Sequence, residues 1–220
     1  MEKLIKVDFH CHSDYSPDSM NRLPDLIKTA RQRGLDKLVI TDHNTLQGAL
    51  AAKAMAPDFI IMGEEIMTDR GEILAAYVKE EIPRDLPVKK VIAMLREQGA
   101  FISVSHPFDP ARGWALDDLM DIKDLVDAVE VYNARCLYEN YNLKALEFAK
   151  QFGLSGTVGS DAHTPFEIGS VGLRLPDFYD AEGLKTAARL GVVEGRLSPA
   201  WVHLLSGIKH KLYRLFNPKK

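Results

Sequence analysis

The sequence is poor in cysteine: only Cys11 and Cys136 occur among its 220 residues, and no CxxC pair is present. Two isolated cysteines exclude a disulfide framework and suit a reducing compartment. Long apolar runs are also missing, which argues against a membrane-spanning helix. The first residues include Glu2 and Lys6 in a strand-like stretch, which does not fit a signal peptide. We therefore expect a cytoplasmic protein without membrane contact.

A strong excess of charge of one sign is absent as well. The formal net charge of -3 at pH 7 argues against nucleic-acid binding through bulk charge, although a local basic patch stays open. With 46% hydrophobic and 27% charged residues, the composition is that of an ordinary globular protein. A chain of 220 residues fits one large domain, because single α/β barrels commonly have this size.

Apolar, strand-like stretches alternate with helical patterns along most of the chain. We expect strands at residues 4–9, 37–41, 59–62, 71–78, 101–104, 128–131 and 154–158. We expect helices at residues 24–32, 45–55, 88–98, 116–125 and 138–152. The short connections between these segments imply a parallel sheet, either closed into a barrel or open.

Histidines follow the expected strands. His10 and His12 share one face of the first strand where it ends, and Asp18 lies in the next loop. Alone, this pattern fits either a metal site or a strand end that happens to carry two histidines. Three more of the seven histidines come directly after other strands: His43, His106 and His163. Because barrel enzymes collect active-site residues at the C-terminal ends of their strands, this distribution favours a barrel with a metal cluster at its mouth.

Three carboxylates accompany these five histidines: Asp18, Glu65 and Asp161. Together they are more ligands than one tetrahedral ion needs. They indicate two or three divalent ions that share a bridging carboxylate and a bridging water. Such ions lower the pKa of the water toward neutrality and hold the oxygens of a transferred phosphoryl group.

The same segments, in order, resemble the successive motifs of the PHP (polymerase and histidinol phosphatase) superfamily. The resemblance rests on His10-x-His12 with Asp18, Thr41-Asp42-His43, Gly63-Glu64-Glu65, Ser105-His106-Pro107 and Gly159-Ser160-Asp161-Ala162-His163. It implies an α/β fold: a distorted (β/α)7 TIM-like barrel in a single domain, with the metal cluster at the C-terminal rim of the strands. It also implies a phosphoesterase that uses two or three divalent ions of zinc, manganese or iron.

The resemblance also implies a role for each matching residue. His10, His12 and Asp161 would bind one ion. His106 would bind a second ion, and Asp18, His43 and His163 would hold a third. Glu65 would bridge the first two ions, whereas Glu64 would face the other way, and Asp42 would orient an imidazole. The residues expected to take part in catalysis are Glu65, Asp161, His163 and Asp42.

One position departs from the family pattern. Leu74 stands where many relatives carry a further histidine ligand, and leucine cannot coordinate a metal. Either the second ion binds more weakly, or Glu72 reaches in from a shifted strand, or only two ions bind. Of the two readings of Glu72, we favour a charged residue that begins a strand over a ligand.

Three residues near the same rim are candidates for substrate binding. Asn133 and Arg135 follow a strand, and Arg112 lies in the loop after His106. Either arginine is suited to hold a phosphate through a bidentate pair, or is an ordinary surface residue. Cys11, between two expected ligands, should face away from the metal and pack in the interior.

The barrel domain is expected to span residues 1–198, followed by an amphipathic segment at 199–220 that becomes basic toward its end. We expect a helix packed on the barrel, with its lysines favoured by the helix dipole. The alternatives are a contact with nucleic acid, with an anionic membrane or with a second copy. His203 and His210 are excluded from the expected metal site.

These features predict a metal-dependent phosphoric ester hydrolase. The expected substrate is a small phosphomonoester, or the terminal phosphate or phosphodiester of a nucleotide or oligonucleotide. The nearly neutral charge favours the small molecule. One alternative is an amidohydrolase-like hydrolase, which typically needs a bridging lysine or an equivalent carboxylate; no strand end here offers the lysine. Another is a non-catalytic metal-binding or regulatory protein of the same superfamily. The native metal and the oligomeric state stay open.

Overall fold

The structure is a computed structural model, and it describes residues 3–216. The strands in this range are β1 (Leu4–Asp8), β2 (Lys37–Ile40), β3 (Ile60–Met67), β4 (Glu72–Ala76), β5 (Phe101–Val104), β6 (Ala128–Asn133), β7 (Ser155–Gly159), β8 (Val171–Pro176) and β9 (Val192–Gly195). The helices are α1 (Leu23–Gln32), α2 (Gln47–Met55), α3 (Val88–Glu97), α4 (Leu116–Ile122), α5 (Glu139–Phe152), α6 (Ala181–Ala188) and α7 (Trp201–Phe216).

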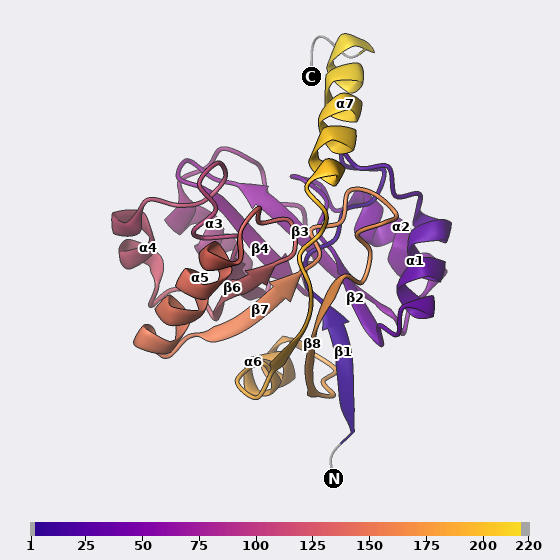
Figure 1. The fold of residues 1–220 in the computed structure, drawn as a ribbon. Coiled ribbons are helices and arrows are strands. Elements are labelled where there is room, and N and C mark those ends of the chain that lie inside the picture. The colour runs from indigo at the N-terminus through magenta and orange to yellow at the C-terminus, as the bar shows by residue number, and fades with distance from the viewer. Residues whose placement is uncertain (1–2, 217–220) are drawn as a thin grey trace.

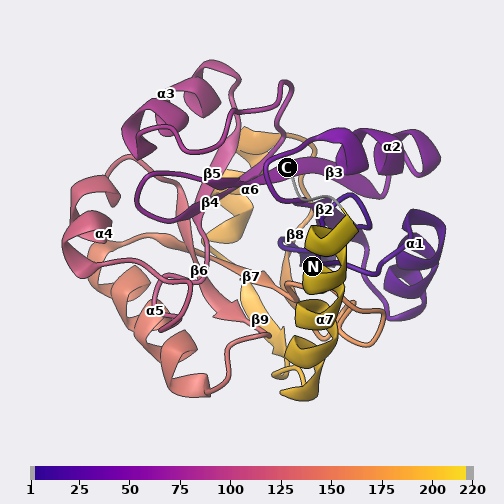
Figure 2. The same ribbon diagram turned by 90° about the horizontal axis from the view of Figure 1, so that it is seen from above.

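The strands form one nearly closed, barrel-like sheet (Figure 1). Their order is β7-β6-β5-β4-β3-β2-β1-β8-β9. The segments after β1 and β7 close the ring, because the Phe9 amide donates to the Val158 carbonyl at 3.0 Å and the Asp161 amide donates to the His10 carbonyl at 2.7 Å. Helices α1 to α5 surround the sheet in the view from above (Figure 2). The expected single-domain α/β barrel is confirmed.

The alternation of strands and helices predicted a parallel sheet. This prediction is wrong for part of the sheet. β4 is antiparallel to both β3 and β5, β8 is antiparallel to β1, and β9 is antiparallel to β8. A short turn joins β3 to β4, in which the Thr68 amide donates to the Gly71 carbonyl at 2.9 Å. The chain therefore reverses without a crossover helix. As a result, the beginning of β4 lies beside the C-terminal ends of its neighbours.

The core lies inside the barrel and between the barrel and its helices. In α1 the buried residues recur at helical spacing, so one face of this helix packs inward: Leu23, Leu26, Ile27 and Ala30. Helix α5 ends at Gly153, whose φ of 68° is left-handed and favours glycine. Segment 164–198, for which the sequence pattern predicted no element, contains β8, α6 and β9.

Helix α7 follows the barrel and stands out from its upper end (Figure 1). Its buried residues are Val202 and Ser206, both in the first half of the helix. The expected C-terminal helix is thus present, and its second half projects from the barrel rather than lying on it. Residues 217–220 of the expected segment lie outside the described range. No helix within residues 3–216 is long and apolar enough to cross a membrane.

Candidate metal centre

The eight expected ligands converge at one end of the barrel from five strands and the loop before α1. His10 and His12 follow β1, His43 follows β2, Glu65 lies in β3, His106 follows β5, Asp161 and His163 follow β7, and Asp18 lies in the loop before α1. Six of the eight are buried, and Asp18 and His43 are partly exposed. The rim of a barrel thus gathers side chains that are as far as 153 positions apart in the sequence, from His10 to His163.

His10, His12 and Asp161 form one close group. The Nε2 atoms of the two histidines lie 2.9 Å apart. Asp161 Oδ1 lies 3.6 Å from Nε2 of His10 and 3.4 Å from Nε2 of His12. Their ligand atoms lie within 4.8 Å of one another, and these are the three residues expected to bind one ion.

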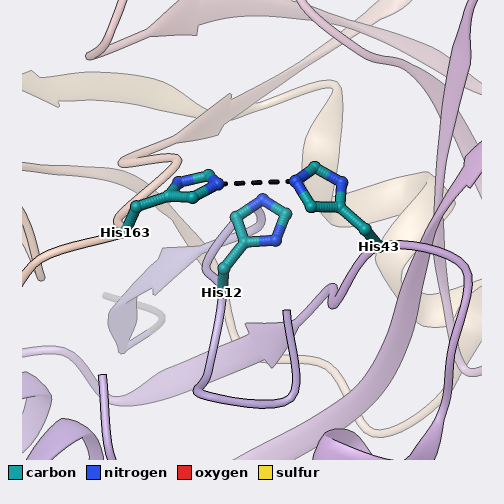
Figure 3. A group of neighbouring side chains, drawn as sticks. All are labelled: His12, His43 and His163. Atoms are coloured by element: carbon teal, nitrogen blue, oxygen red, sulfur yellow. Dashed lines mark hydrogen bonds between the residues drawn. The ribbon is translucent and has the colours of Figure 1, made fainter. Parts of the chain in front are cut away.

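His12 also joins a second group with His43 and His163 (Figure 3). Nε2 of His163 lies 3.4 Å from Nε2 of His43. The Asp18 carboxylate faces both rings, at 3.6 Å from His43 and 3.4 Å from His163. The three residues expected around a third ion therefore lie together.

Glu65 lies between these groups. Its carboxylate oxygens are 3.2 Å from Nε2 of His10, 3.3 Å from Nε2 of His12 and 3.4 Å from Nε2 of His106. Nδ1 of His43 is closer still, at 2.9 Å. A carboxylate in contact with four imidazoles has the position expected of a bridge between ions.

Glu72, which we had preferred to read as a charged residue at the start of a strand, points into the cluster. Its Oε2 lies 3.4 Å from Nε2 of His106 and its Oε1 lies 3.8 Å from Nδ1 of His43. Because β4 is antiparallel, its first residue lies at the rim. Leu74, two residues deeper on the same face of β4, is buried in the barrel interior. The structure thus favours the shifted-strand reading.

Hydrogen bonds orient three of the rings so that Nε2 faces the cluster. Nδ1 of His10 lies 3.0 Å from Glu130 Oε1, and Nδ1 of His163 lies 2.8 Å from the Asp161 carbonyl. Nδ1 of His12 lies 3.2 Å from Ser16 Oγ. These acceptors keep the proton on Nδ1 and leave the Nε2 lone pair for a ligand.

Asp42 acts on the site through hydroxyl groups. It accepts hydrogen bonds from Ser13 Oγ at 2.6 Å and from Ser16 Oγ at 2.7 Å. Ser16 in turn is the acceptor for His12. Asp42 therefore supports an imidazole, as expected, but through an intervening serine. It makes no direct contact with the cluster side chains among the described residues.

The charges at the centre favour bound cations. Four buried or half-buried carboxylates belong to the cluster: Asp18, Glu65, Glu72 and Asp161. Such a concentration of negative charge is costly to bury unless cations compensate it. Asp161 Oδ1 and both ring nitrogens of the buried His106 have no hydrogen-bond partner among the described residues. Nitrogen and oxygen donors left over in this way fit divalent metal ions.

The pKa values of the cluster show the same compensation. Burial opposes the ionised forms, but His10 and neighbouring imidazoles hold the pKa of Glu65 well below its usual value. Burial and Arg112 disfavour the charged form of His106, yet Glu65 and Glu72 raise the pKa of His106 to about 9. Burial, together with His163 and His43, lowers the pKa of His12 and keeps that ring neutral. Binding of metal would therefore displace protons.

The three expected substrate-binding residues differ in their surroundings. Arg112 lines the cavity over the cluster, and its Nη1 lies 2.5 Å from Asp161 Oδ2. The Arg135 guanidinium also borders this cavity, but it is buried against Glu167 at 3.1 Å and Ser206 at 2.7 Å. Asn133 is fully buried.

The amide of Asn133 supports the cluster from beneath. Its Nδ2 donates to Glu130 Oε2 at 3.0 Å and to Asp161 Oδ2 at 3.2 Å. Its Oδ1 accepts from the Arg135 amide at 2.9 Å. With these partners Asn133 holds Asp161 in place, and Arg112 is the one of the three that is best placed to meet a substrate.

Sequence comparisons link this site to known proteins. Residues 8–99 match the PHP domain family, and residues 139–192 match the PHP-associated family. An uncharacterized protein of Methanocaldococcus jannaschii is 35% identical over 178 residues, which are 79% of this chain and 71% of that protein. A Caldicellulosiruptor bescii protein named "Probable phosphatase" is 23% identical over 198 residues, 75% of this chain and 82% of that protein.

Two solved structures share the fold. PsfC from Pseudomonas syringae PB-5123 has a TM-score of 0.71 at 18% identity, covering 96% of this chain and 99% of that one. The lesion-specific endonuclease PfuEndoQ from Pyrococcus furiosus has a TM-score of 0.63 at 18% identity, covering 87% of this chain and 57% of that one. The metal-ligand geometry and these matches agree, and the chain belongs to the PHP family.

Several residues of the site were not predicted from the sequence. Glu130 and Ser16 orient two histidines, and the first sign of Glu130 is a charged residue inside the apolar strand β6. The residues of α7 that border the cavity include four with basic side chains: His203, His210, Lys211 and Arg214. Their position could not be read from the helical pattern, because the pattern does not say where the helix lies.

Proposed function

We propose that the protein is a metal-dependent phosphoesterase. The observation that carries this proposal is the convergence of five imidazoles and four carboxylates beneath a cavity of about 850 Å³, with Arg112 at its wall. Such a set of donors fits two or three divalent ions, and zinc, manganese and iron all accept imidazole and carboxylate ligands. The name of one relative, "Probable phosphatase", and that of one structural neighbour, a lesion-specific endonuclease, agree with this proposal.

Divalent ions held there would supply an activated water and would neutralise the charge of a phosphoryl group. The residues of this chain have separate tasks around them. His10, His12 and Asp161 would hold one position, and Glu65, Glu72 and His106 a second. Asp18, His43 and His163 would hold a third. Arg112 offers guanidinium N–H groups to phosphoryl oxygens.

The surroundings of the cluster keep these ligands in position. The fully buried Glu130 fixes the His10 ring through a hydrogen bond, and the fully buried Asp42 supports the His12 ring through Ser16. His106 and Asp161 have left-handed φ angles of 23° and 51°. Such conformations are uncommon outside glycine and concentrate at functional sites. We propose that Glu65, Asp161, His163 and Asp42 are required for turnover on this basis.

The test combines metal analysis with a generic substrate. Purified protein should contain two or three ions per chain and hydrolyse p-nitrophenyl phosphate when manganese, zinc or iron is supplied. His43→Ala and Asp161→Ala should each remove at least about 99% of this activity, because each deletes a ligand. Lys144→Ala, on the exposed face of α5, is the control and should keep full activity.

The alternatives predict other results. An amidohydrolase would hydrolyse amide or lactone substrates and leave p-nitrophenyl phosphate intact. Among the described residues that line the cavity, the one lysine is Lys211, which comes from helix α7 and not from a strand end, and this disfavours that chemistry. A metal-binding protein without catalysis would bind ions but turn over neither class of substrate.

A further inference from the structure

Helix α7 exposes a continuous stripe of large apolar side chains. At 3.6 residues per turn, its members lie within about 120° of one another around the helix axis. Each is at least 48% exposed. This apolar stripe consists of Trp201, Leu204, Ile208, Leu212, Leu215 and Phe216. A stripe of this width normally packs on the core of a protein, but here it faces solvent.

The remaining surface of α7 faces the barrel and the metal cavity. Val202 and Ser206, on one flank of the stripe, are buried, and Arg135 Nη2 donates to Ser206 Oγ at 2.7 Å. His203 and His210, on the far side of the helix, border the cavity. Of the stripe, Leu215 alone also reaches the cavity. The helix is thus held by its polar side, with its apolar side turned outward.

The stripe continues onto the barrel at the beginning of α7. The Trp201 ring meets Phe166 edge to face, with centroids 5.2 Å apart, and Phe166 is itself 63% exposed. Arg33 Nη1 donates to the Phe166 carbonyl at 2.9 Å, which places a guanidinium beside the two rings. Exposed tryptophan and phenylalanine next to a cation are typical of surfaces that enter the boundary between lipid and water.

The charged residues of α7 are all basic. Between Trp201 and Phe216 the helix contains Lys209, Lys211 and Arg214 but no carboxylate, although the whole chain carries a net charge of -3. Lys209 and Lys211 lie at the two edges of the apolar stripe. Lys211 is exposed, and the Lys209 ammonium donates to the Ser19 carbonyl. An apolar stripe with cations along its edges matches a surface that is apolar inside and anionic outside.

The same features disfavour a second copy of the chain as the occupant of the stripe. Paired helices carry opposite charges along the edges of their seam, whereas two copies of α7 would bring lysines together without a carboxylate. The seam of paired helices also uses about two residues in seven, and this stripe is wider. A nucleic acid would pair with the cations but leave the apolar side chains in water.

We propose that α7 binds the surface of an anionic lipid bilayer, with the helix in the plane of the surface and the apolar stripe among the lipid headgroups and upper acyl chains. The helix of 16 residues would cover about 24 Å of that surface, at 1.5 Å per residue. The edge lysines would reach lipid phosphates while their methylene groups stay with the stripe. For the whole chain we had expected no membrane contact; α7 favours the anionic-membrane alternative. The proposal does not depend on phosphoesterase activity.

The test is flotation of the full-length protein with vesicles of phosphatidylcholine, with and without about 30% phosphatidylglycerol. The wild type should bind the anionic vesicles about tenfold or more tightly than the neutral ones. High salt should weaken this binding by screening the cations, without abolishing it, because apolar contact remains.

The apolar contribution is measured with Leu204→Gln/Leu212→Gln. Both leucines are exposed, so the substitutions leave the fold intact, as circular dichroism can confirm. The variant should bind anionic vesicles about tenfold or more weakly than the wild type. Leu116→Gln/Met120→Gln is the matched control, because it removes two exposed apolar side chains from α4. It should bind as the wild type does.

The charge contribution is measured with Lys211→Gln/Arg214→Gln. This variant should lose about tenfold or more in affinity for the anionic vesicles and little for the neutral ones. Lys144→Gln/Lys150→Gln, which removes two exposed cations from α5, is the matched control and should bind as the wild type does.

Fluorescence reports whether the stripe enters the lipid. The chain has two tryptophans, of which Trp114 is buried and Trp201 is half-exposed. With anionic vesicles the emission should move to shorter wavelength, and brominated acyl chains should quench it. Neither change should occur with Leu204→Gln/Leu212→Gln at the same vesicle concentration.

Three results would overturn the inference. One is an absence of binding to either kind of vesicle. Another is equal binding of the wild type and Leu204→Gln/Leu212→Gln, which would mean adsorption by charge alone. The third is a wild-type dimer in analytical ultracentrifugation that this variant dissociates, without vesicle binding. That result would assign the apolar stripe to a second copy of the chain.

Discussion

Glu130 Oε1 lies 3.0 Å from Nδ1 of His10, and both side chains are fully buried beneath the metal centre. The second oxygen of the same carboxylate accepts from the His106 amide at 2.8 Å and from Asn133 at 3.0 Å. One carboxylate thus fixes the ring of one metal ligand and the backbone of another. Glu130 is a positioning residue, since it supports the ligands from behind.

We predict that Glu130→Gln weakens metal binding by roughly 10- to 100-fold, the usual effect of losing such a support. Glutamine keeps the shape of the side chain but loses its charge and one acceptor. Titration with manganese, followed by metal analysis after dialysis, measures the affinity. Glu147→Gln, an exposed glutamate on α5, should leave it unchanged. An unaltered affinity in Glu130→Gln would show that His10 needs no support.

The contact between His10 and Glu130 requires a glycine at position 159. A Cβ atom at Gly159 would overlap Cβ of His10 and Oε1 of Glu130. We predict that Gly159→Ala pushes the two side chains apart and lowers both metal affinity and the melting temperature. In Gly207→Ala a Cβ meets nothing within 4 Å, and the helix should become more stable by about 0.5–1 kcal/mol. Opposite shifts in the two melting curves are expected.

The sequence contained most of the ligands, because their positions follow from the order of strands alone. A histidine placed after a strand reaches the rim of a barrel whichever neighbours the strand pairs with. Glu72 needed more information: its place depends on β4 running antiparallel to β3 and β5. A strand that begins at the rim presents its first residue there, whereas the family pattern places the ligand farther along, at Leu74.

Contacts between distant side chains could not be predicted in the same way. Glu130 meets His10 across 120 positions, and the register of β6 and β7 decides this contact. The cavity wall formed by α7 depends on a bond between Arg135 and Ser206, 71 residues apart. A hydrophobic pattern predicts that such a helix exists, but not which face of the barrel it contacts.

We predict that Glu72→Gln removes about one ion per chain or weakens its binding by roughly 10- to 100-fold. The reason is that its carboxylate lies 3.4 Å from His106 and 3.8 Å from His43. Metal content at increasing manganese concentrations gives the stoichiometry. Glu97→Gln, on the exposed part of α3, should bind the full number of ions. Wild-type stoichiometry and affinity in Glu72→Gln would restore the reading of a charged strand start.

Glu64 points away from the cluster, as expected of it, and is buried with one oxygen unpaired among the described residues. Its other oxygen accepts from the Ile82 amide at 3.1 Å. Burial, with Glu81 nearby, raises the pKa of Glu64 from 4.5 to about 8. The folded protein therefore keeps this carboxyl protonated at pH 7, whereas the unfolded chain ionises it.

The sign of the pH dependence follows from this difference. Below pH 4.5 the group is neutral in both states, and its contribution to stability is fully present. As the pH rises toward about 8, ionisation favours the unfolded chain and this contribution is lost. We predict that Glu64→Gln flattens the fall in unfolding free energy between pH 5 and pH 8. Urea denaturation in EDTA measures it, with Glu80→Gln at an exposed position as control. Parallel pH curves for Glu64→Gln and wild type would mean that Glu64 is ionised in the folded protein.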